Sequence, residues 1–180
     1  MNDNRLDGSR HSTDDEKLAI VDEHDRVIGC TARKDIHDRG LRHRSVHVVV
    51  SNPNGEIFVQ QRSATKDVDP LKWDTAAAGH VDFGESYPDC AVRELEEELG
   101  IAGATPELFD TLPASLETGN EFVHVYSVIS DQSLRLNREE IADGRWCPVD
   151  DLERWINAEP DRFTSAFRLI FERFRAKLIS

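Results

Sequence analysis

The sequence predicts an α/β protein with a mixed β-sheet, built as one domain. Two runs, Val46–Val50 and Ile57–Gln61, have the length and residue types of buried strands, and the turn Asn52–Gly55 joins them. Further along, apolar residues between Val92 and Leu99 recur at the spacing of three and four that marks one face of a helix. A length of 180 residues fits a single domain with a sizeable core.

The predicted domain covers residues 16–180. Residues 1–15 are polar, charged and rich in Asp, Asn and Ser, a composition typical of a flexible tail. Apolar runs on either side of a polar turn then predict a hairpin, and a helical stretch ended by a glycine follows it. These first elements are the strands Leu18–Val21 and Val27–Thr31 and the short helix Ala32–Asp38, which stops at Gly40.

The second half of the chain predicts more strands and two closing helices. The strands are Pro106–Leu112, Glu121–Ile129 and Arg145–Val149. A helix capped by Asp150 or Asp151 is expected to run through Trp155, and a helical stripe of apolar residues extends from Phe163 to Leu178. This stripe is expected to pack on the sheet, and its surplus of aromatic residues leaves a homodimer open.

Composition excludes several classes of function. The net charge is −13, from 35 acidic and 22 basic residues, which argues against binding nucleic acid or a membrane surface through bulk charge. Cys30, Cys90 and Cys147 lack disulfide or metal-ligand spacing, as expected of a reduced, cytoplasmic protein. No apolar run has the length of a membrane span, and no signal peptide is recognisable. A phosphate site here would need a metal and a few local cations.

Carboxylates crowd one face of the helix that follows Pro88. At about 100° per residue, Glu94, Glu97 and Glu98 share an arc, whereas Glu96 projects to the other flank. Like charges this close destabilise a helix unless a cation lies among them. Hard oxygen ligands select Mg²⁺, with Mn²⁺ as the alternative. The simpler interpretation is a solvated acidic face, which is what most glutamate runs are.

Arg93 lies one turn before Glu97 and is placed to hold that carboxylate as a bidentate partner. The surrounding string, with its fixed spacing, resembles the signature of the Nudix hydrolases. The matching residues, which we call the box, are Gly79, Glu85, Arg93, Glu94, Leu95, Glu97, Glu98, Gly100 and Ile101. This resemblance implies an α/β/α sandwich and Mg²⁺-dependent cleavage of a diphosphate. It also implies that Arg93 orients a glutamate and that Glu94, Glu97 and Glu98 bind metal or activate water.

A wider stretch resembles one Nudix branch, which contains isopentenyl-diphosphate isomerases and poorly defined hydrolases. The resemblance implies that Arg62 and Lys66 contact the substrate diphosphate, although surface cations are the commoner fate of such residues. The isomerases need a cysteine where this chain has Ala78, and alanine cannot do acid–base chemistry. They also keep only some of the box carboxylates. Isomerase activity is therefore not expected from the shared scaffold.

Two further sets of residues keep alternatives open. In the isomerases, the residues that match His37, His43 and His80 belong to a second metal site, whereas structural or surface histidines are the commoner outcome. Glu121 matches a metal-bound catalytic glutamate and is a candidate ligand or general base, with an exposed strand-start charge as the simpler interpretation. Glu139 and Glu140 are rival suppliers of that carboxylate.

The expected function is hydrolysis of a nucleoside-diphosphate-type or other organic diphosphate, a small-molecule substrate, with Glu98, Glu94 or Glu121 as the base. An isomerase of diphosphate-bearing alkenes and a non-catalytic ligand-sensing module are the alternatives. The organic half of the substrate stays open, because aromatic residues that could stack on a nucleobase could equally fill the core. These residues are Trp73, Phe83, Tyr87 and Tyr126.

Overall fold

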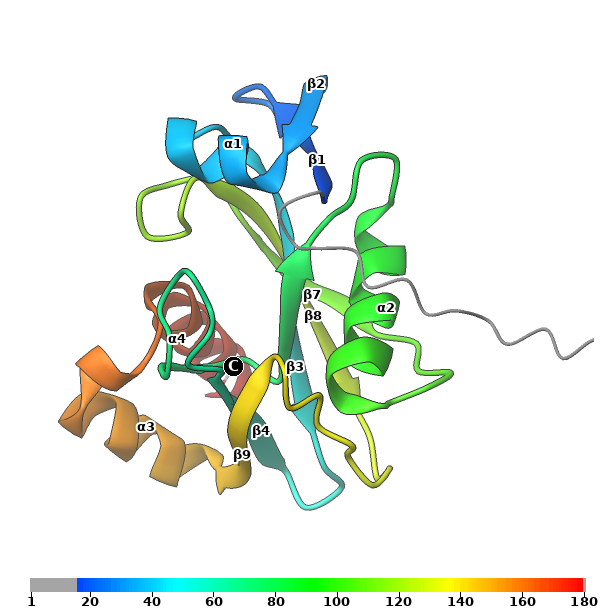
Figure 1. Cartoon of the computed structure of the whole chain (residues 1–180). Helices are drawn as coiled ribbons and strands as arrows, with labels where there is room; N and C mark the ends of the chain where they lie inside the picture. The colour runs from blue at the N-terminus through cyan, green and yellow to red at the C-terminus, as the bar shows by residue number, and fades with distance from the viewer. Residues whose placement is uncertain (1–15, 180) are drawn as a thin grey trace, which may run out of the picture.

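A computed structural model describes residues 16–179 of the chain (Figure 1); the predicted tail at residues 1–15 lies outside them. The strands are β1 (Lys17–Val21), β2 (Val27–Ala32), β3 (His43–Ser51), β4 (Glu56–Arg62), β5 (Trp73–Asp74), β6 (Ala77–His80), β7 (Glu107–Leu112), β8 (Glu121–Ile129) and β9 (Ile141–Pro148). The helices are α1 (Arg33–Arg39), α2 (Tyr87–Leu99), α3 (Val149–Ala158) and α4 (Ser165–Ile179), with the 3₁₀ turn η1 (Pro160–Arg162).

The main sheet is mixed, as the sequence predicts. Its strand order is β5-β4-β3-β8-β7, with β6 paired to β3 and β9 paired to β4. Strands β3 and β8 run parallel over nine register pairs from His43↔Glu121 to Ser51↔Ile129, and the other pairs are antiparallel. The predicted hairpin β1–β2 forms a separate two-stranded sheet.

The main sheet splits between its two central antiparallel strands. β3 and β4 pair only at Ser51↔Ile57, next to the turn that joins them. Away from this turn, β3 pairs with β6 while β4 pairs with β9 and β5. At this split, Glu98 of α2 contacts both Gln60 of β4 and Ala78 of β6.

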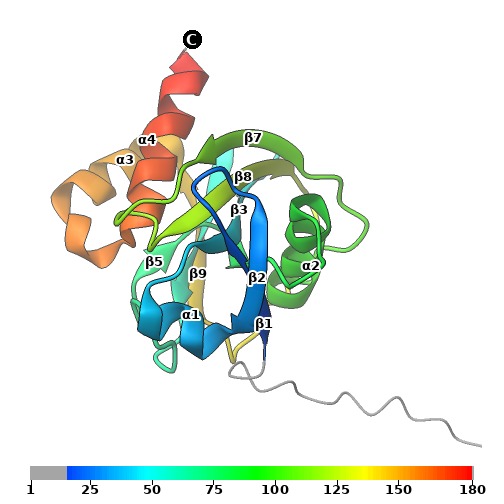
Figure 2. The same cartoon turned by 90° about the horizontal axis from the view of Figure 1, so that it is seen from above.

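Helices cover both faces of the sheet, which confirms the α/β/α sandwich. Figures 1 and 2 show α2 on one side and α3 with α4 on the other. Side chains alternate along β3, so Val48 and Val50 belong to the core cluster of α2, whereas Val49 belongs to that of α3 and α4. None of the helices within residues 16–179 has the length and apolar character needed to cross a bilayer.

The ends of α2 follow from its sequence. Ser86 is the N-cap residue, and its side chain accepts a hydrogen bond from the backbone N–H of Asp89. Pro88 lies in the first turn, where its missing N–H costs no hydrogen bond. The helix ends at Gly100, whose φ of 70° is in the left-handed region that favours glycine. A glycine ends α1 in the same way: Gly40 has a φ of 60°.

Some sequence-based expectations about the elements are wrong. Neither Asp150 nor Asp151 caps α3. Pro148 occupies the N-cap position, and no side-chain hydrogen bond caps the helix within the described residues. Both aspartates lie in the first turn, where their charge interacts favourably with the positive end of the helix. Phe163 precedes α4 as a buried residue, and the side chain of Leu178 lies outside the description. Strands β5 and β6 were not expected, because two residues, or a run of Ala, Gly and His, carry little strand propensity.

Candidate active site

A cleft of about 1010 Å³ lies at the end of the sheet where β3 and β4 have diverged. Its walls combine residues of α1, β3, β6 and α2 with the loops around residues 65–69, 116–119 and 137–140. The residues predicted to act in catalysis, to bind Mg²⁺ or to bind phosphate all line this cleft, whereas His43 of the possible second metal site is not among the described residues that line it. The predicted residues that line it are Arg62, Lys66, Arg93, Glu94, Glu97, Glu98 and Glu121. The fold therefore brings together groups that are up to 59 positions apart in the chain, counted from Arg62 to Glu121.

The carboxylates of α2 enter the cleft to different depths. Glu94 and Glu98 are buried, whereas the Glu97 side chain is 58% exposed. Glu96 is exposed and is not among the described residues that line the cleft. The helix face that carries Glu94, Glu97 and Glu98 therefore lines the cleft.

Gly79 makes room for the carboxylate of Glu94. A Cβ added at position 79 would overlap both oxygens and the carboxyl carbon of Glu94. Backbone atoms of β6 cannot move aside without breaking the pairing of Val46 with Gly79. Glycine is needed here for a close approach, and not for a left-handed backbone.

Glu98 lies in the split between β4 and β6. Its Oε2 accepts a hydrogen bond of 2.9 Å from Nε2 of Gln60 on β4 and one of 3.3 Å from the backbone N–H of Ala78 on β6. The backbone of Ala78 is fixed by its pairing with His47, and Gln60 projects from a paired strand, so Glu98 has two partners before any ligand binds. Sequence reasoning did not identify Gln60, because a glutamine at a strand end has no distinctive pattern.

Burial makes both inner carboxylates hold protons more tightly than usual. Desolvation raises the pKa of Glu94 above 4.5 although Arg93 opposes the shift. Desolvation likewise raises the pKa of Glu98, and the charge of Glu94 raises it further. A divalent cation at this position would take the place of the protons, because metal binding and deprotonation are linked.

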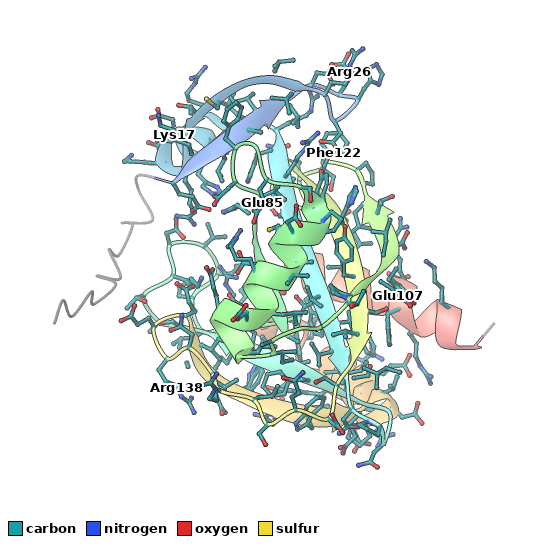
Figure 3. All side chains as sticks on the ribbon, turned by 90° about the vertical axis from the view of Figure 1, so that its right-hand side faces the viewer. Lys17, Arg26, Glu85, Glu107, Phe122 and Arg138 are labelled. Carbon is teal, nitrogen blue, oxygen red and sulfur yellow. The ribbon has the colours of Figure 1, made fainter. Side chains whose placement is uncertain are left out.

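Arg93 has a different main partner from the one predicted. Its Nε and Nη2 donate to the two carboxylate oxygens of Glu85 at 2.9 and 3.0 Å, which is the bidentate pair. Glu97 receives a single bond of 3.1 Å, and Glu94 receives one of 2.7 Å. Figure 3 shows Glu85 beside the first turns of α2. The arginine therefore ties the loop before the helix to two of the box carboxylates.

The two predicted phosphate-binding cations already have anionic partners. Lys66 forms an ion pair with Glu140. Arg62 donates to the carbonyl oxygen of Val68 and lies 3.4 Å from Oδ2 of Asp74. Both cations face the cleft, and Glu140 contributes to its wall together with Glu139.

Glu121 lies among histidines. Its Oε1 is 3.4 Å from Nε2 of His43 and 3.5 Å from Nε2 of His80. Burial would raise the pKa of this carboxyl group, but its interactions with the two histidines outweigh burial and hold the pKa well below 4.5. Burial also lowers the pKa of His37 to about 4, with further lowering from His80 and His43. The simpler interpretation of an exposed strand-start charge is wrong for Glu121.

The three histidines offer ligand atoms that lie within 4.8 Å of one another. His43 Nδ1 lies 3.0 Å from the carbonyl oxygen of Leu41, which favours a proton on that nitrogen, while Nε2 faces Oε1 of Glu121. Nε2 of His37 and of His43 are buried without a hydrogen-bond partner in the described part of the chain. This donor set fits a transition metal better than Mg²⁺.

Three more polar residues of the cleft were not expected to belong to a site. Asp74, Ser45 and His47 all line it. Ser45 and His47 alternate with valine in a strand whose other residues are mostly apolar, and this period of two was the available signal. Asp74 has no such signal, because its strand contains only two residues.

Comparisons with known proteins agree with this geometry. A family profile described as NUDIX domain matches residues 41–167. An uncharacterized Nudix hydrolase of Pseudomonas aeruginosa is 43% identical over 143 residues, which cover 76% of this chain and 81% of that protein. An isopentenyl-diphosphate Delta-isomerase of Photorhabdus laumondii is 31% identical over 160 residues, covering 87% and 90%.

A solved structure supports the same conclusion. The crystal structure of a Deinococcus radiodurans protein superposes with a TM-score of 0.71 at 29% identity, covering 79% of this chain and 90% of that one. Sequence profile, relatives and fold therefore agree with the spacing of the box residues on α2. This chain belongs to the Nudix hydrolase family.

Proposed function

We propose that this protein is a Mg²⁺-dependent hydrolase of a diphosphate linkage in a small organic molecule. The observation that carries the proposal is the convergence of Glu94, Glu97 and Glu98 on one cleft, two of them buried. Buried carboxylates without a cation are costly, and oxygen-only donors favour Mg²⁺, with Mn²⁺ as the alternative.

Glu94, Glu97 and Glu98 would hold the metal, whose chemistry when bound is to neutralise charge on the diphosphate oxygens. These residues fit such a metal because Gly79 leaves room for the Glu94 carboxylate and because two donors hold Glu98 in place. Arg93 orients Glu94 and Glu97 from the outer side of the helix. Arg62 and Lys66 also line the cleft and would bind the terminal phosphate oxygens. Each would do so while it keeps its present carboxylate partner, Asp74 for Arg62 and Glu140 for Lys66.

The proton of the attacking water would go to a carboxylate of the cleft. Glu98, Glu94 and Glu121 are the candidates, and their surroundings differ. Glu121 is ionised but engaged by two histidines, whereas Glu98 is buried and accepts hydrogen bonds from the Gln60 amide and the backbone N–H of Ala78. A carboxylate close to a bound cation stays ionised, so position and not a raised pKa would make it a base.

The histidine cluster favours a second bound cation in the same cleft. We take His37, His43 and His80, with Glu121, as donors for a transition metal such as Mn²⁺ or Zn²⁺. Metal analysis of the protein purified without chelator tests this part separately. A stoichiometric transition metal that is lost in His43→Gln would support it, and a metal content unchanged by that substitution would contradict it.

Isomerisation is the weaker alternative, although relatives with about a third of their residues identical carry isomerase names. Ala78 lines the cleft, and its only polar contribution is a backbone N–H bonded to Glu98. No side chain at this position can exchange a proton with carbon. A purely ligand-sensing role is opposed by the complete set of box carboxylates.

A substrate panel tests the proposal. Purified protein would be incubated with nucleoside diphosphate derivatives, dinucleotides, sugar diphosphates and prenyl diphosphates, each with Mg²⁺, Mn²⁺ or EDTA. The expected result is release of phosphate or a phosphomonoester from at least one class, with the release abolished by EDTA. Absence of metal-dependent hydrolysis across the whole panel would contradict the proposed function.

A further inference from the structure

The cleft contains a polar pair on β3 that the proposed hydrolysis leaves without a role. Ser45 and His47 lie two residues apart, so their side chains face the same side of the strand, about 7 Å apart along it. Both line the cleft, and both are buried, with 3% and 6% exposure.

Ser45 has an unused hydroxyl group. Its Oγ is buried and has no hydrogen-bond partner within the described residues. A buried hydroxyl without a partner costs about 1 to 3 kcal/mol. Native proteins rarely leave such a group unsatisfied unless a water or a ligand pairs with it. The hydroxyl of Ser45 therefore indicates a bound oxygen or nitrogen atom at this point of the cleft.

The tautomer of His47 follows from its neighbours. Nδ1 lies 2.8 Å from Oγ1 of Thr75, and that hydroxyl donates its one proton to the carbonyl oxygen of Ala77 at 3.2 Å. With its proton directed to Ala77, Oγ1 accepts a hydrogen bond from Nδ1–H. Oδ1 of Asp74 lies 3.5 Å from the same nitrogen, and its negative charge also favours a proton there.

The other ring nitrogen of His47, Nε2, is available to a ligand in the cleft. A neutral imidazole with its proton on Nδ1 carries a lone pair on Nε2, which can only accept a hydrogen bond. Within the described residues, no group forms a hydrogen bond with Nε2 of His47. This atom is also not fully buried, so a ligand in the cleft can reach it. Asp74 is itself held by the backbone N–H of Thr75 at 2.8 Å and by Arg62 at 3.4 Å, so the arrangement is fixed before a ligand arrives.

We propose that Ser45 and His47 form a subsite for a hydroxyl group, which donates its proton to Nε2 of His47 and accepts the proton of Ser45. An ionised phosphate oxygen does not fit, because it has no proton for Nε2. The proposal rests on the proposed function, since it places this hydroxyl next to the diphosphate site formed by Arg62 and Lys66. His47 is then a residue that contacts the reacting complex directly.

Two sources can supply the hydroxyl group. It belongs either to the organic half of the substrate, which is then a hydroxylated molecule such as a sugar, or to the attacking water. In the second case Nε2 accepts a hydrogen bond from one O–H of the water and the other water proton passes to the carboxylate base, while the water oxygen bonds to phosphorus and the bond from phosphorus to the leaving oxygen breaks. The shared chemistry is an O–H group donating to one nitrogen.

The tautomer can be measured without any substrate. Long-range ¹H–¹⁵N correlation spectra of the full chain distinguish the two neutral forms of each histidine, and the signal missing in His47→Asn assigns His47. The expected form has the proton on Nδ1. A neutral His47 with its proton on Nε2 would overturn the proposal, whatever the enzyme hydrolyses.

Kinetic variants then identify the source. His47→Asn keeps a donor near Thr75 but removes Nε2, whereas His47→Gln places an amide near the Nε2 position. Ser45→Ala removes the other half of the subsite, and His24→Asn on the exposed hairpin turn is the matched control. The probes are ADP-ribose, which carries hydroxyl groups, and isopentenyl diphosphate, which carries none. Thermal unfolding verifies that each variant is folded.

A substrate hydroxyl predicts a loss of about tenfold in kcat/KM for ADP-ribose alone in His47→Asn and Ser45→Ala, with recovery in His47→Gln. Attacking water predicts a loss of about 100-fold or more in kcat on every hydrolysed probe, without recovery in His47→Gln. Variants within twofold of the wild type on both probes would overturn the subsite. A wild type that hydrolyses no diphosphate would refute the proposed function, and the tautomer would still decide the subsite.

Discussion

The carboxylate of Glu94 occupies the space beside Gly79 in which any other residue would place its Cβ atom. One residue of a strand and one of a helix, 15 positions apart, thereby set how deeply the helix carboxylate reaches into the cleft. Gly79 is therefore a packing requirement of the proposed metal site, since its backbone pairs with Val46 in ordinary strand geometry.

Gly79→Ala is expected to move Glu94 out of position. Because the overlapping atoms belong to the end of a flexible side chain, the cost in unfolding free energy is expected at the low end of overpacking, about 1 kcal/mol. A displacement near 1 Å is enough to lower turnover by about 100-fold. Denaturant unfolding and Mg²⁺-dependent hydrolysis measure the two effects. Gly29→Ala is the control, because a Cβ there meets only Cδ1 of Ile20 at an ordinary 3.7 Å; similar behaviour of the two variants would contradict this account of Gly79.

Arg93→Lys tests the bidentate pair with Glu85. A lysine ammonium cannot donate to both oxygens of Glu85 in a fixed plane while also bonding Glu94 and Glu97. We expect a loss of about 1.5 to 3 kcal/mol in unfolding free energy and weaker Mg²⁺ binding by calorimetry. Arg154→Lys, at an exposed ion pair with Asp151, should change neither quantity. Full retention of metal affinity in Arg93→Lys would show that the arginine does not organise the box.

The metal-free protein should lose stability as the pH rises above neutrality. Burial raises the pKa of Glu98 in the folded state above its unfolded value near 4.5. A raised carboxyl pKa contributes stability that is complete below pH 4.5 and is lost as the pH rises through the folded pKa. Above pH 7, most histidines are already neutral when unfolded, with an ordinary pKa of 6.5, so the carboxylates dominate.

Unfolding free energies measured in EDTA between pH 7 and 8.5 test this linkage. Glu98→Gln should flatten the decline, because glutamine has no proton to lose, whereas exposed Glu107→Gln should leave it unchanged. Added Mg²⁺ should stabilise the wild type more at pH 8.5 than at pH 7, since fewer protons must then be displaced. A decline of equal slope in wild type and Glu98→Gln would contradict a raised pKa at Glu98.

Incubation with isopentenyl diphosphate in deuterated water should give no dimethylallyl diphosphate and no deuterium at carbon. Ala78 provides no group for proton exchange in the cleft, and Ala78→Cys would add only one of the groups that isomerisation needs. Proton NMR of the recovered diphosphate detects both changes. Isomer formation by the wild type at a rate comparable to its hydrolysis would show that another residue replaces the cysteine.

The sequence predicted the parts of the fold that depend on local patterns. Helix α2 is predicted because Pro88, the apolar stripe and the final Gly100 lie within one short segment, whereas its Ser86 cap is seen only in the structure. Strand β8 was predicted with both its ends, Glu121 and Ile129, because its residues alternate clearly. Strand β6 was missed because its pairing with β3, and not the propensity of Ala and Gly, makes it a strand.

Only the part of the candidate site that depends on local geometry could be predicted from the sequence. Glu94, Glu97 and Glu98 could be placed on one face from helix geometry alone. The bidentate partner of Arg93 could not, because Glu85 reaches it from a loop whose path depends on tertiary packing. Gln60 and Asp74 could not be predicted for a similar reason, because each acquires its role only through a tertiary contact. Gln60 bonds Glu98 of α2, and Asp74 lies beside Arg62 of the paired strand.

Turnover of the Glu98→Gln variant tests the central claim most directly. The change keeps the size of the side chain and its place between Gln60 and Ala78, and it removes the negative charge. With the best substrate of the panel and saturating Mg²⁺, we expect hydrolysis to fall by about 100-fold or more while circular dichroism and thermal unfolding show an intact fold. Near-normal Mg²⁺-dependent hydrolysis by a folded Glu98→Gln variant would contradict the assignment of this cleft as a carboxylate-based diphosphate hydrolase site.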